Sequence, residues 1–200
     1  MKREGEVRHF KVITYSNGDT YEGQQAADGR REGRGTYTTA QGDVYVGTYL
    51  AGQRHGHGVY TRKDGSRYEG DFRDGCPHGM GVYVFEDGSI YRGAFANDEF
   101  HGRGRWSSVK GDYYEGEYRK GKRHGHGVLM VAGTRYDGEW EDDARCGQGR
   151  LELRNGDWYE GGFADGKFHG KGRYHFKATN STVEATFRNG KPVSAKNGTM

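Results

Sequence analysis

Disulfide frameworks, membrane-spanning segments and secretory signals are all missing from this sequence of 200 residues. Its two cysteines, Cys76 and Cys146, form no Cys-x-x-Cys pair and no disulfide framework, so we expect a reducing compartment. There is no run of about 18 apolar residues, and the charged residues 1–6 lead into no apolar segment of the kind found in signal peptides. We therefore expect a soluble, cytoplasmic protein.

Signatures of catalysis and of nucleic-acid binding are absent as well. The sequence has no Gly-x-Ser-x-Gly motif, no Walker phosphate loop and no His-Glu-x-x-His motif. Its net charge of +3 is too balanced to suggest the concentrated basic face that nucleic-acid binding needs. We expect no enzymatic activity, no cofactor and no nucleic-acid partner.

Hydrophobic residues are scarce, at 32% of the chain, whereas 37 residues are glycine. A thick two-layer core is therefore not expected. The 15 tyrosines, 9 phenylalanines and 3 tryptophans recur in register, with a repeat of about 23 residues that decides the architecture. The repeat units begin at Tyr21, Tyr45, Tyr68, Tyr91, Tyr114, Tyr136 and Tyr159, and a degenerate copy begins at Val183.

Each repeat unit contains the pattern of two strands. At its start, Tyr, Gly and an aromatic residue alternate with mostly charged residues, which is the period of a strand with one aromatic face. A Gly-x-Gly-x-aromatic segment follows, as at residues 56–60. Glycine weakens a strand unless another group approaches closely, so we expect a ring over each of these glycines. Asp64-Gly65 and Asp87-Gly88, just before the next Tyr, favour the positive φ angles of tight hairpin turns.

These patterns predict an all-β fold, namely an elongated, single-layer, twisted antiparallel sheet of stacked β-hairpin repeats. About 16 strands at about 4.8 Å each would span roughly 75 Å. We expect a charged N-terminal tail at residues 1–9, the repeat array at 10–190 with partial units at both ends, and a C-terminal tail at 191–200. Pro192 suits an exposed sheet end, because proline cannot donate to a strand ladder.

The unit Tyr-Glu-Gly-x-aromatic-x-x-Gly-x-x-His-Gly-x-Gly is nearly intact at residues 68–81 and 114–127. It resembles the MORN (membrane occupation and recognition nexus) repeat, and the resemblance covers about nine-tenths of the chain. MORN repeats occur in membrane-tethering junction proteins, in lipid kinases, beside methyltransferase domains and in stand-alone scaffolds of cilia, basal bodies and cytoskeletons. Because this chain contains only repeats, the resemblance implies a non-enzymatic scaffold or adaptor of the cytoplasm, with the cytoskeleton, the cilium and the membrane periphery as the expected settings.

The aromatic stripe is first of all the core, but a single-layer sheet cannot cover its own aromatic face completely. Some rings should therefore line an open groove that binds a segment of a protein partner, such as a cytoskeletal or motor protein. The candidate groove residues are Tyr49, Tyr60, Phe72, Tyr83, Phe95, Trp106, Tyr118, Trp140, Phe163 and Tyr174. The recurring histidines should stand roughly 9–10 Å apart in successive units, too far to share one zinc ion, so we expect no metal site within the chain.

The alternative hypothesis is a peripheral membrane module that binds anionic lipid such as phosphoinositide. The candidate lipid contacts are the basic loop residues Lys122, Arg123, Lys167 and Lys171. A homodimer through the terminal repeats is a further expectation, because both ends of an open sheet present unpaired backbone groups.

Overall fold

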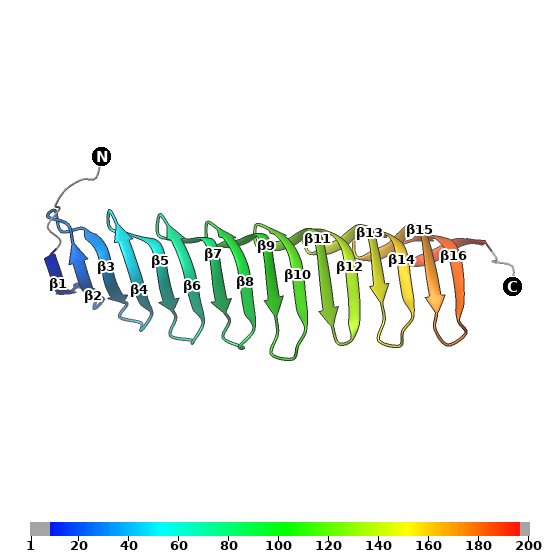
Figure 1. The fold of residues 1–200 in the computed structure, drawn as a ribbon, viewed down its shortest axis with the longest axis horizontal. Helices are drawn as coiled ribbons and strands as arrows, with labels where there is room; N and C mark the ends of the chain where they lie inside the picture. The colour runs from blue at the N-terminus through cyan, green and yellow to red at the C-terminus, as the bar shows by residue number, and fades with distance from the viewer. Residues whose placement is uncertain (1–8, 197–200) are drawn as a thin grey trace. The chain divides into compact units, whose positions relative to one another are not determined.

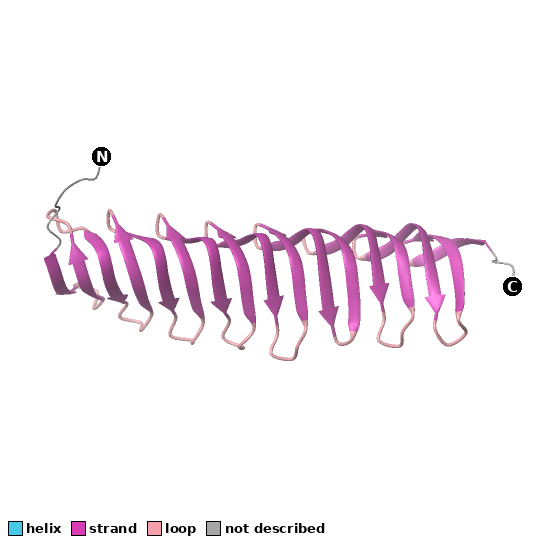
Figure 2. Cartoon of the chain, in the orientation of Figure 1, coloured by secondary structure: helices cyan, strands magenta, loops and turns pink. Residues whose placement is uncertain are grey.

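The computed structural model describes residues 9–196. Of the tails expected at residues 1–9 and 191–200, residues 1–8 and 197–200 lie outside the described residues. The chain divides into two compact units, Met1–Glu99 and Phe100–Met200. The described residues form 17 strands and no helix (Figure 2). No helix among them could therefore cross a membrane.

From β1 to β8, the strands of the first unit pair antiparallel with their neighbours in the sequence (Figure 1). Its strands are β1 (His9–Thr14), β2 (Thr20–Gln25), β3 (Arg31–Thr38), β4 (Val44–Leu50), β5 (Gln53–Thr61), β6 (Arg67–Arg73), β7 (Cys76–Val84) and β8 (Ile90–Ala96).

The second unit repeats the same antiparallel pairing of sequence neighbours. Its strands are β9 (Glu99–Ser107, which begins on the last residue of the first unit), β10 (Tyr113–Arg119), β11 (Lys122–Val131), β12 (Thr134–Glu141), β13 (Ala144–Glu152), β14 (Trp158–Ala164), β15 (Lys167–Phe176), β16 (Ser181–Arg188) and β17 (Lys191–Lys196). The predicted all-β fold of hairpin repeats is confirmed. The sheet continues past residue 190, because β17 pairs with β16 within the segment expected to be a tail.

The hairpin turns are of two kinds. Ala51-Gly52, between β4 and β5, has positive φ at both residues, as a two-residue type I′ turn requires. At Asp64-Gly65 only the glycine has positive φ, and the Gly65 amide donates to the carbonyl of Arg62. This is the pattern of a longer loop that ends in a glycine bulge, so Asp64-Gly65 does not form the two-residue turn that its sequence favours. Asp87-Gly88 likewise has positive φ only at its glycine, whereas Asp74-Gly75 has it at both residues and forms a two-residue turn between β6 and β7.

The first tyrosine of each 23-residue repeat is the most buried large side chain of that repeat, with less than 2% of its surface exposed. Its ring lies over two glycines that face each other across the hairpin, as Tyr68 does over Gly70 and Gly81. A Cβ atom on Gly70 would lie 2.5 Å from the Tyr68 hydroxyl and 2.6 Å from the Cα atom of Gly81. No side chain fits there, which explains these glycines.

The first glycine of each Gly-x-Gly segment has a different role from the one expected. In the β4–β5 hairpin the register shifts after Gly47, which pairs with Gly58, while Thr48 pairs with His55. Gly56 lies in the resulting bulge with φ 62°, a left-handed conformation that favours glycine. The expectation of a ring over each glycine is therefore wrong for Gly56, where the backbone conformation is the reason.

Edge-to-face contacts connect the rings of successive 23-residue repeats within each compact unit. Phe72 packs between Tyr45 and Tyr68, with ring centroids 5.0 and 5.1 Å apart and near-perpendicular planes. In the second unit Trp140 lies in the same way between Tyr114 and Tyr136, at 5.4 and 5.2 Å. Such pairs add about 0.5–1.5 kcal/mol to the free energy of burial. The aromatic residue of each unit thus joins it to the preceding one.

Candidate functional site

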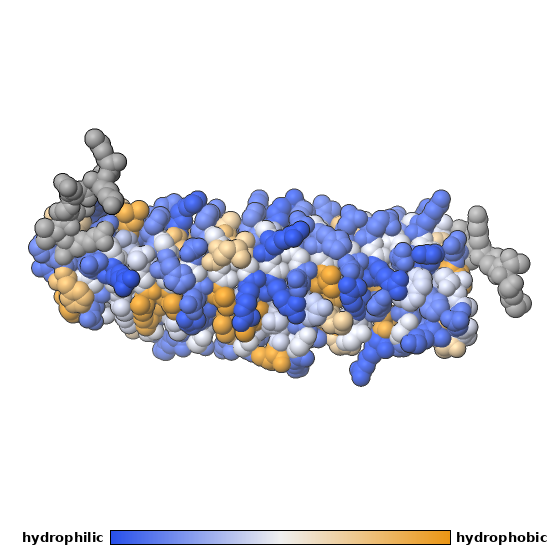
Figure 3. All heavy atoms as spheres, viewed as in Figure 1, coloured by the Kyte–Doolittle hydropathy of each residue, from blue (hydrophilic) through white to orange (hydrophobic). Residues whose placement is uncertain are grey.

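The sheet of each unit has two different faces. We call the face that carries the buried tyrosines the aromatic face and the opposite one the charged face. The charged face holds charged side chains that contact each other across neighbouring strands. Arg105 forms an ion pair with Glu115 at 2.5 Å in the second unit, and His57 lies 3.8 Å from the Asp71 carboxylate in the first. Figure 3 shows mostly hydrophilic residues with separate hydrophobic groups among them. The charges of the charged face largely neutralise each other.

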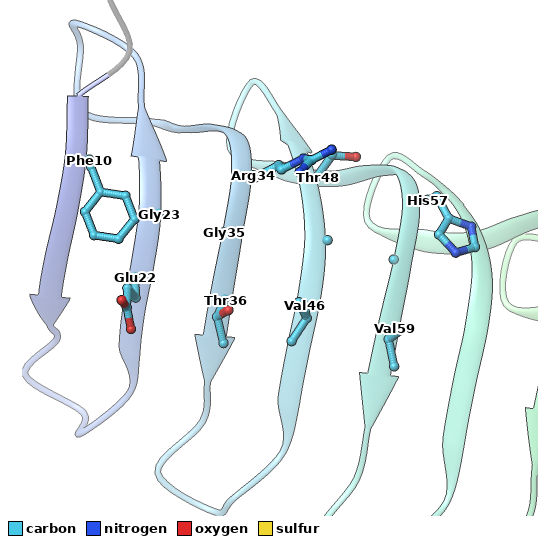
Figure 4. A pocket seen from close by; sticks show the side chains of 12 residues that line it. Phe10, Glu22, Gly23, Arg34, Gly35, Thr36, Val46, Thr48, His57 and Val59 are labelled. Carbon is cyan, nitrogen blue, oxygen red and sulfur yellow. The ribbon is translucent and has the colours of Figure 1, made fainter.

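A shallow hollow of about 610 Å³ lies on the charged face of the first unit, across β1 to β5. Its floor is the glycine row of Gly23, Gly35, Gly47 and Gly58, and Figure 4 shows Phe10, Val46 and Val59 beside it. Phe10 and Val46 are exposed by 65% and 50%. Sequence reasoning did not identify this hollow, since it arises where glycines align across strands.

On the aromatic face, one residue of each repeat lies over the rings, at a place that we call the cover position. In most repeats it is the second residue after the two-residue hairpin turn, as Arg54 is after Ala51-Gly52. Its carbonyl accepts a hydrogen bond from the turn of the next repeat, as that of Arg31 does from the Gly52 amide at 2.9 Å. The cover residues are Arg31, Arg54, Pro77, Phe100, Arg123, Arg145 and Phe168. Arginine at this position stacks on the rings, whereas Phe168 stacks on Tyr159 with ring centroids 3.8 Å apart.

A groove of about 360 Å³ opens on the aromatic face of the first unit. We call it the tyrosine–arginine groove. It is lined by Arg31, Tyr37, Thr39, Asp43, Tyr45, Tyr49, Gly52, Gln53, Arg54, Tyr60 and Gly75. The buried rings of Tyr45 and Tyr49 form its apolar base, and the half-buried Tyr37 and Tyr60 expose their edges.

Asp43 orients one wall of this groove. Its carboxylate accepts hydrogen bonds from the Tyr60 hydroxyl at 2.7 Å and from the Lys63 amide at 3.0 Å. The Tyr60 hydroxyl, followed by the Lys63 amide, lowers the pKa of Asp43 below its ordinary value. Burial, and next the Asp43 carboxylate, raise the pKa of Tyr60. Asp43 is therefore anionic and Tyr60 neutral at physiological pH, and the tyrosine ring is held in one orientation.

The structure separates the ten predicted groove residues into two groups. Six of them are buried core rings with 3–7% of their surface exposed, namely Tyr49, Phe72, Phe95, Tyr118, Trp140 and Phe163. The other four, Tyr60, Tyr83, Trp106 and Tyr174, are half-buried and retain surface that a partner can contact. The Trp140 indole N–H donates to the carbonyl of Gly127 at 3.1 Å, so it is already used within the fold.

The four predicted lipid contacts also differ from one another. Lys122, Lys167 and Lys171 are exposed. Arg123 is half-buried, pairs with Asp143 at 2.9 Å and lies 4.4 Å over the Trp140 ring. Its guanidinium is thus engaged in holding the core. Between residues 9 and 196, no three His, Cys, Asp or Glu side chains gather closely enough to hold a metal ion.

Sequence reasoning missed the cover arginines as part of the groove. Arg31 and Arg54 lie 23 residues apart at equivalent places in their units, and this spacing was the available signal. The rings that they contact include those of Tyr49 and Phe72, which lie on other strands, and the spacing does not reveal such contacts.

A family model described as MORN repeat matches the chain at residues 27–44, 45–67, 68–90, 91–113, 114–130, 136–158 and 159–178. Six of these matches begin at predicted unit starts, and the first begins after Tyr21. No curated protein sequence matches the chain.

Solved structures with some likeness to the chain include three domains. The TCP domain of SAS-4 (dCPAP) of Drosophila melanogaster, in complex with a proline-rich motif of Ana2 (dSTIL), is 8% identical, with 89% of this chain and 90% of that chain covered and a TM-score of 0.46. A mutant TCP10 domain of Danio rerio CPAP is 16% identical, with coverages of 94% and 99% and a TM-score of 0.34. The G-box domain of the microcephaly protein CPAP is 14% identical, with coverages of 90% and 100% and a TM-score of 0.29. All three TM-scores lie below 0.5.

Proposed function

The chain belongs to the MORN-repeat family, and we propose that it is a non-enzymatic scaffold that holds a segment of a partner protein along its aromatic face. The partner is an extended or helical segment of a cytoskeletal or motor protein. The setting is a cytoplasmic assembly of the cytoskeleton, the cilium or the membrane periphery.

One observation carries the proposal, namely the tyrosine–arginine groove. Its base is apolar and buried, and its walls present Tyr37, Tyr60, Arg31 and Arg54. Tyrosine and arginine are the residue types that contribute most of the binding energy at protein interfaces. In the second unit, Trp106 and Tyr174 are the half-buried aromatic residues that would contact a partner in the same way.

Selection of peptides from a displayed random library tests this proposal without a known partner. The selected peptides should bind the wild-type protein and lose at least tenfold in affinity for the variant Tyr37→Ala with Tyr60→Ala, since loss of one interface anchor costs about 2 kcal/mol. The matched control is Val46→Ala with Met80→Ala, which removes exposed side chains from the charged face. If the control loses affinity and the tyrosine variant keeps it, the groove is not the binding site.

Vesicle sedimentation examines the lipid alternative in the same preparation. The variant replaces Lys122, Arg123, Lys167 and Lys171 by Ser, and the probe is a vesicle that contains phosphatidylserine and a phosphoinositide. Exposed charges are screened beyond about 8 Å at physiological ionic strength, so lipid binding through them should weaken with salt. Salt-sensitive vesicle binding that this variant alone abolishes, together with failure of the peptide selection, would replace the scaffold by a membrane module.

A further inference from the structure

The two cover arginines of the tyrosine–arginine groove are held by rings alone. The Arg31 guanidinium carbon lies 4.8 Å from the Tyr37 ring centroid and 5.2 Å from that of Tyr49. Arg54 has the same arrangement one repeat later, with its guanidinium carbon 5.1 Å from the Tyr60 ring centroid and 5.4 Å from that of Phe72. Stacking on aromatic faces restrains a guanidinium but uses none of its N–H donors.

Neither guanidinium meets an acidic partner within residues 9–196, where the salt bridges and hydrogen bonds involve other groups. The equivalent arginines of the second unit are different. Arg123 pairs with Asp143, and Arg145 donates to the carbonyl of Gly166 at 2.8 Å. The first unit therefore offers two restrained cations, both half-buried, whose donors are available to a ligand.

Asp43 is the charged group that opposes them in the groove lining. Both of its oxygens accept hydrogen bonds, from Tyr60 and from the Lys63 amide. It therefore does not serve as the counter-ion of either arginine. A ligand with carboxylates would supply the missing partners, because arginine and carboxylate form short, two-pronged hydrogen bonds.

The spacing of the two arginines restricts the form of the ligand. Equivalent residues of successive repeats lie two strands apart, which is a distance of roughly 9–10 Å. A polyproline II segment advances about 3.1 Å per residue with three residues per turn, so its side chains at i and i+3 point the same way about 9.3 Å apart. In a β-strand the side chains at i and i+3 point to opposite faces. The spacing of the two arginines thus matches one turn of polyproline II.

We propose that the tyrosine–arginine groove binds an acidic, extended peptide segment whose two carboxylates, three residues apart, pair with Arg31 and Arg54. This inference rests on the proposed function and specifies the chemistry of its partner. Prolines or other apolar residues between the two acids pack on the edges of Tyr37 and Tyr60, as in other aromatic-lined grooves that bind polyproline II segments.

Fluorescence anisotropy with synthetic proline-based peptides tests the inference. A peptide with glutamate at i and i+3 should bind the wild-type protein at least tenfold more tightly than its glutamine analogue or an isomer with glutamate at i and i+2. The variant Arg31→Gln with Arg54→Gln should lose this preference. The control Arg73→Gln with Arg92→Gln, which changes exposed arginines of the same unit, should keep it. Arg31→Lys with Arg54→Lys, which retains the charge but not the two-pronged geometry, should bind with intermediate affinity.

Equal affinity for the glutamate and glutamine peptides, or full binding by the double glutamine variant with a wild-type melting curve, would overturn the inference. If library peptides bind at Tyr37 and Tyr60 but show no acidic preference, the inference fails and the scaffold function stands. If no peptide of any kind binds the groove, both fail. Binding of anionic vesicles that requires Arg31 and Arg54, with no peptide binding, would also overturn the inference in favour of lipid.

Discussion

The side chain of the tyrosine that begins each repeat has two structural roles. Its ring fills the space over two glycines, and its hydroxyl donates to the carbonyl three residues later, as Tyr68 does to Asp71 at 2.9 Å. The same bond forms in Tyr45 with Thr48 and in Tyr114 with Glu117, at 3.0 Å each. The carbonyl lies beside the bulge, where the register of the hairpin shifts and the strand ladder is interrupted. Phenylalanine would fill the space but leave this carbonyl without the hydroxyl donor.

Tyr68→Phe should therefore lower the free energy of unfolding by about 1–2 kcal/mol, because an acceptor that loses its buried donor is left without compensation from water. Chemical denaturation followed by circular dichroism measures the change. Tyr113→Phe is the control, since the Tyr113 hydroxyl has no hydrogen bond to any described residue and its ring only stacks with Arg105. Equal losses in both variants would show that the hydroxyl bond does not contribute to stability.

At the scale of the element, the hairpin turns carry local strain where an L-residue has a left-handed conformation. Ala51, Lys120 and Ala132 precede a glycine in two-residue turns with φ of 52°, 51° and 49°. Ala132 is in the loop between β11 and β12, where the unit that begins at Tyr114 is one residue short. The deletion converts the longer loop into a type I′ turn, for which Asn-Gly is the favoured pair.

Ala132→Asn should raise the free energy of unfolding by about 0.5–1 kcal/mol. The left-handed conformation costs an ordinary L-residue about 1–2 kcal/mol, and asparagine recovers part of it through local hydrogen bonds. Thermal denaturation of the two proteins measures the gain. Ala40→Asn provides the matched control, because Ala40 is exposed in a longer loop and does not have a positive φ. A gain of the same size there would contradict the turn explanation.

At the scale of the whole molecule, stability is spread over seven equivalent tyrosines, three of them in the second unit and four in the first. Burial raises the pKa of these phenols above the ordinary value of 10.0, and it raises the pKa of Tyr45 to about 12. The folded state therefore binds the phenol protons more tightly than the unfolded state. Their contribution to stability is complete below pH 10 and is lost as the pH rises through the folded pKa.

The protein should accordingly unfold on raising the pH from 10 to 12, with the buried tyrosines ionising in the same step. Ultraviolet absorbance of tyrosinate and circular dichroism, recorded together, follow the two events. Tyr91→Phe should make the pH dependence less steep, since it removes one linked proton. Complete ionisation of the tyrosines with an unchanged sheet spectrum would refute the linkage.

The sequence by itself determined the local features of this protein. Alternation of Tyr, Gly and a second aromatic with charged residues has the period of a strand, and two strands per 23 residues predict hairpins without helices. The expected approach of a ring is confirmed at Gly58, over which the Tyr45 ring lies, but not at Gly56. These features follow from residue type and spacing alone, because strand period and steric contact act over a few residues.

The tertiary structure decided which rings a partner can reach. The sequence pattern placed Phe72 and Trp140 among the expected groove residues. In the structure, however, each of these rings is enclosed between the tyrosines of two successive repeats. The bulge at Gly56 shifts the strand register, and Arg54, on the turn side of this bulge, lies over the rings of Tyr60 and Phe72. Burial and charge pairing depend on contacts between successive repeats. The pattern within one repeat therefore could not reveal that Arg31 and Arg54 lack the acidic partner that Arg123 has in Asp143.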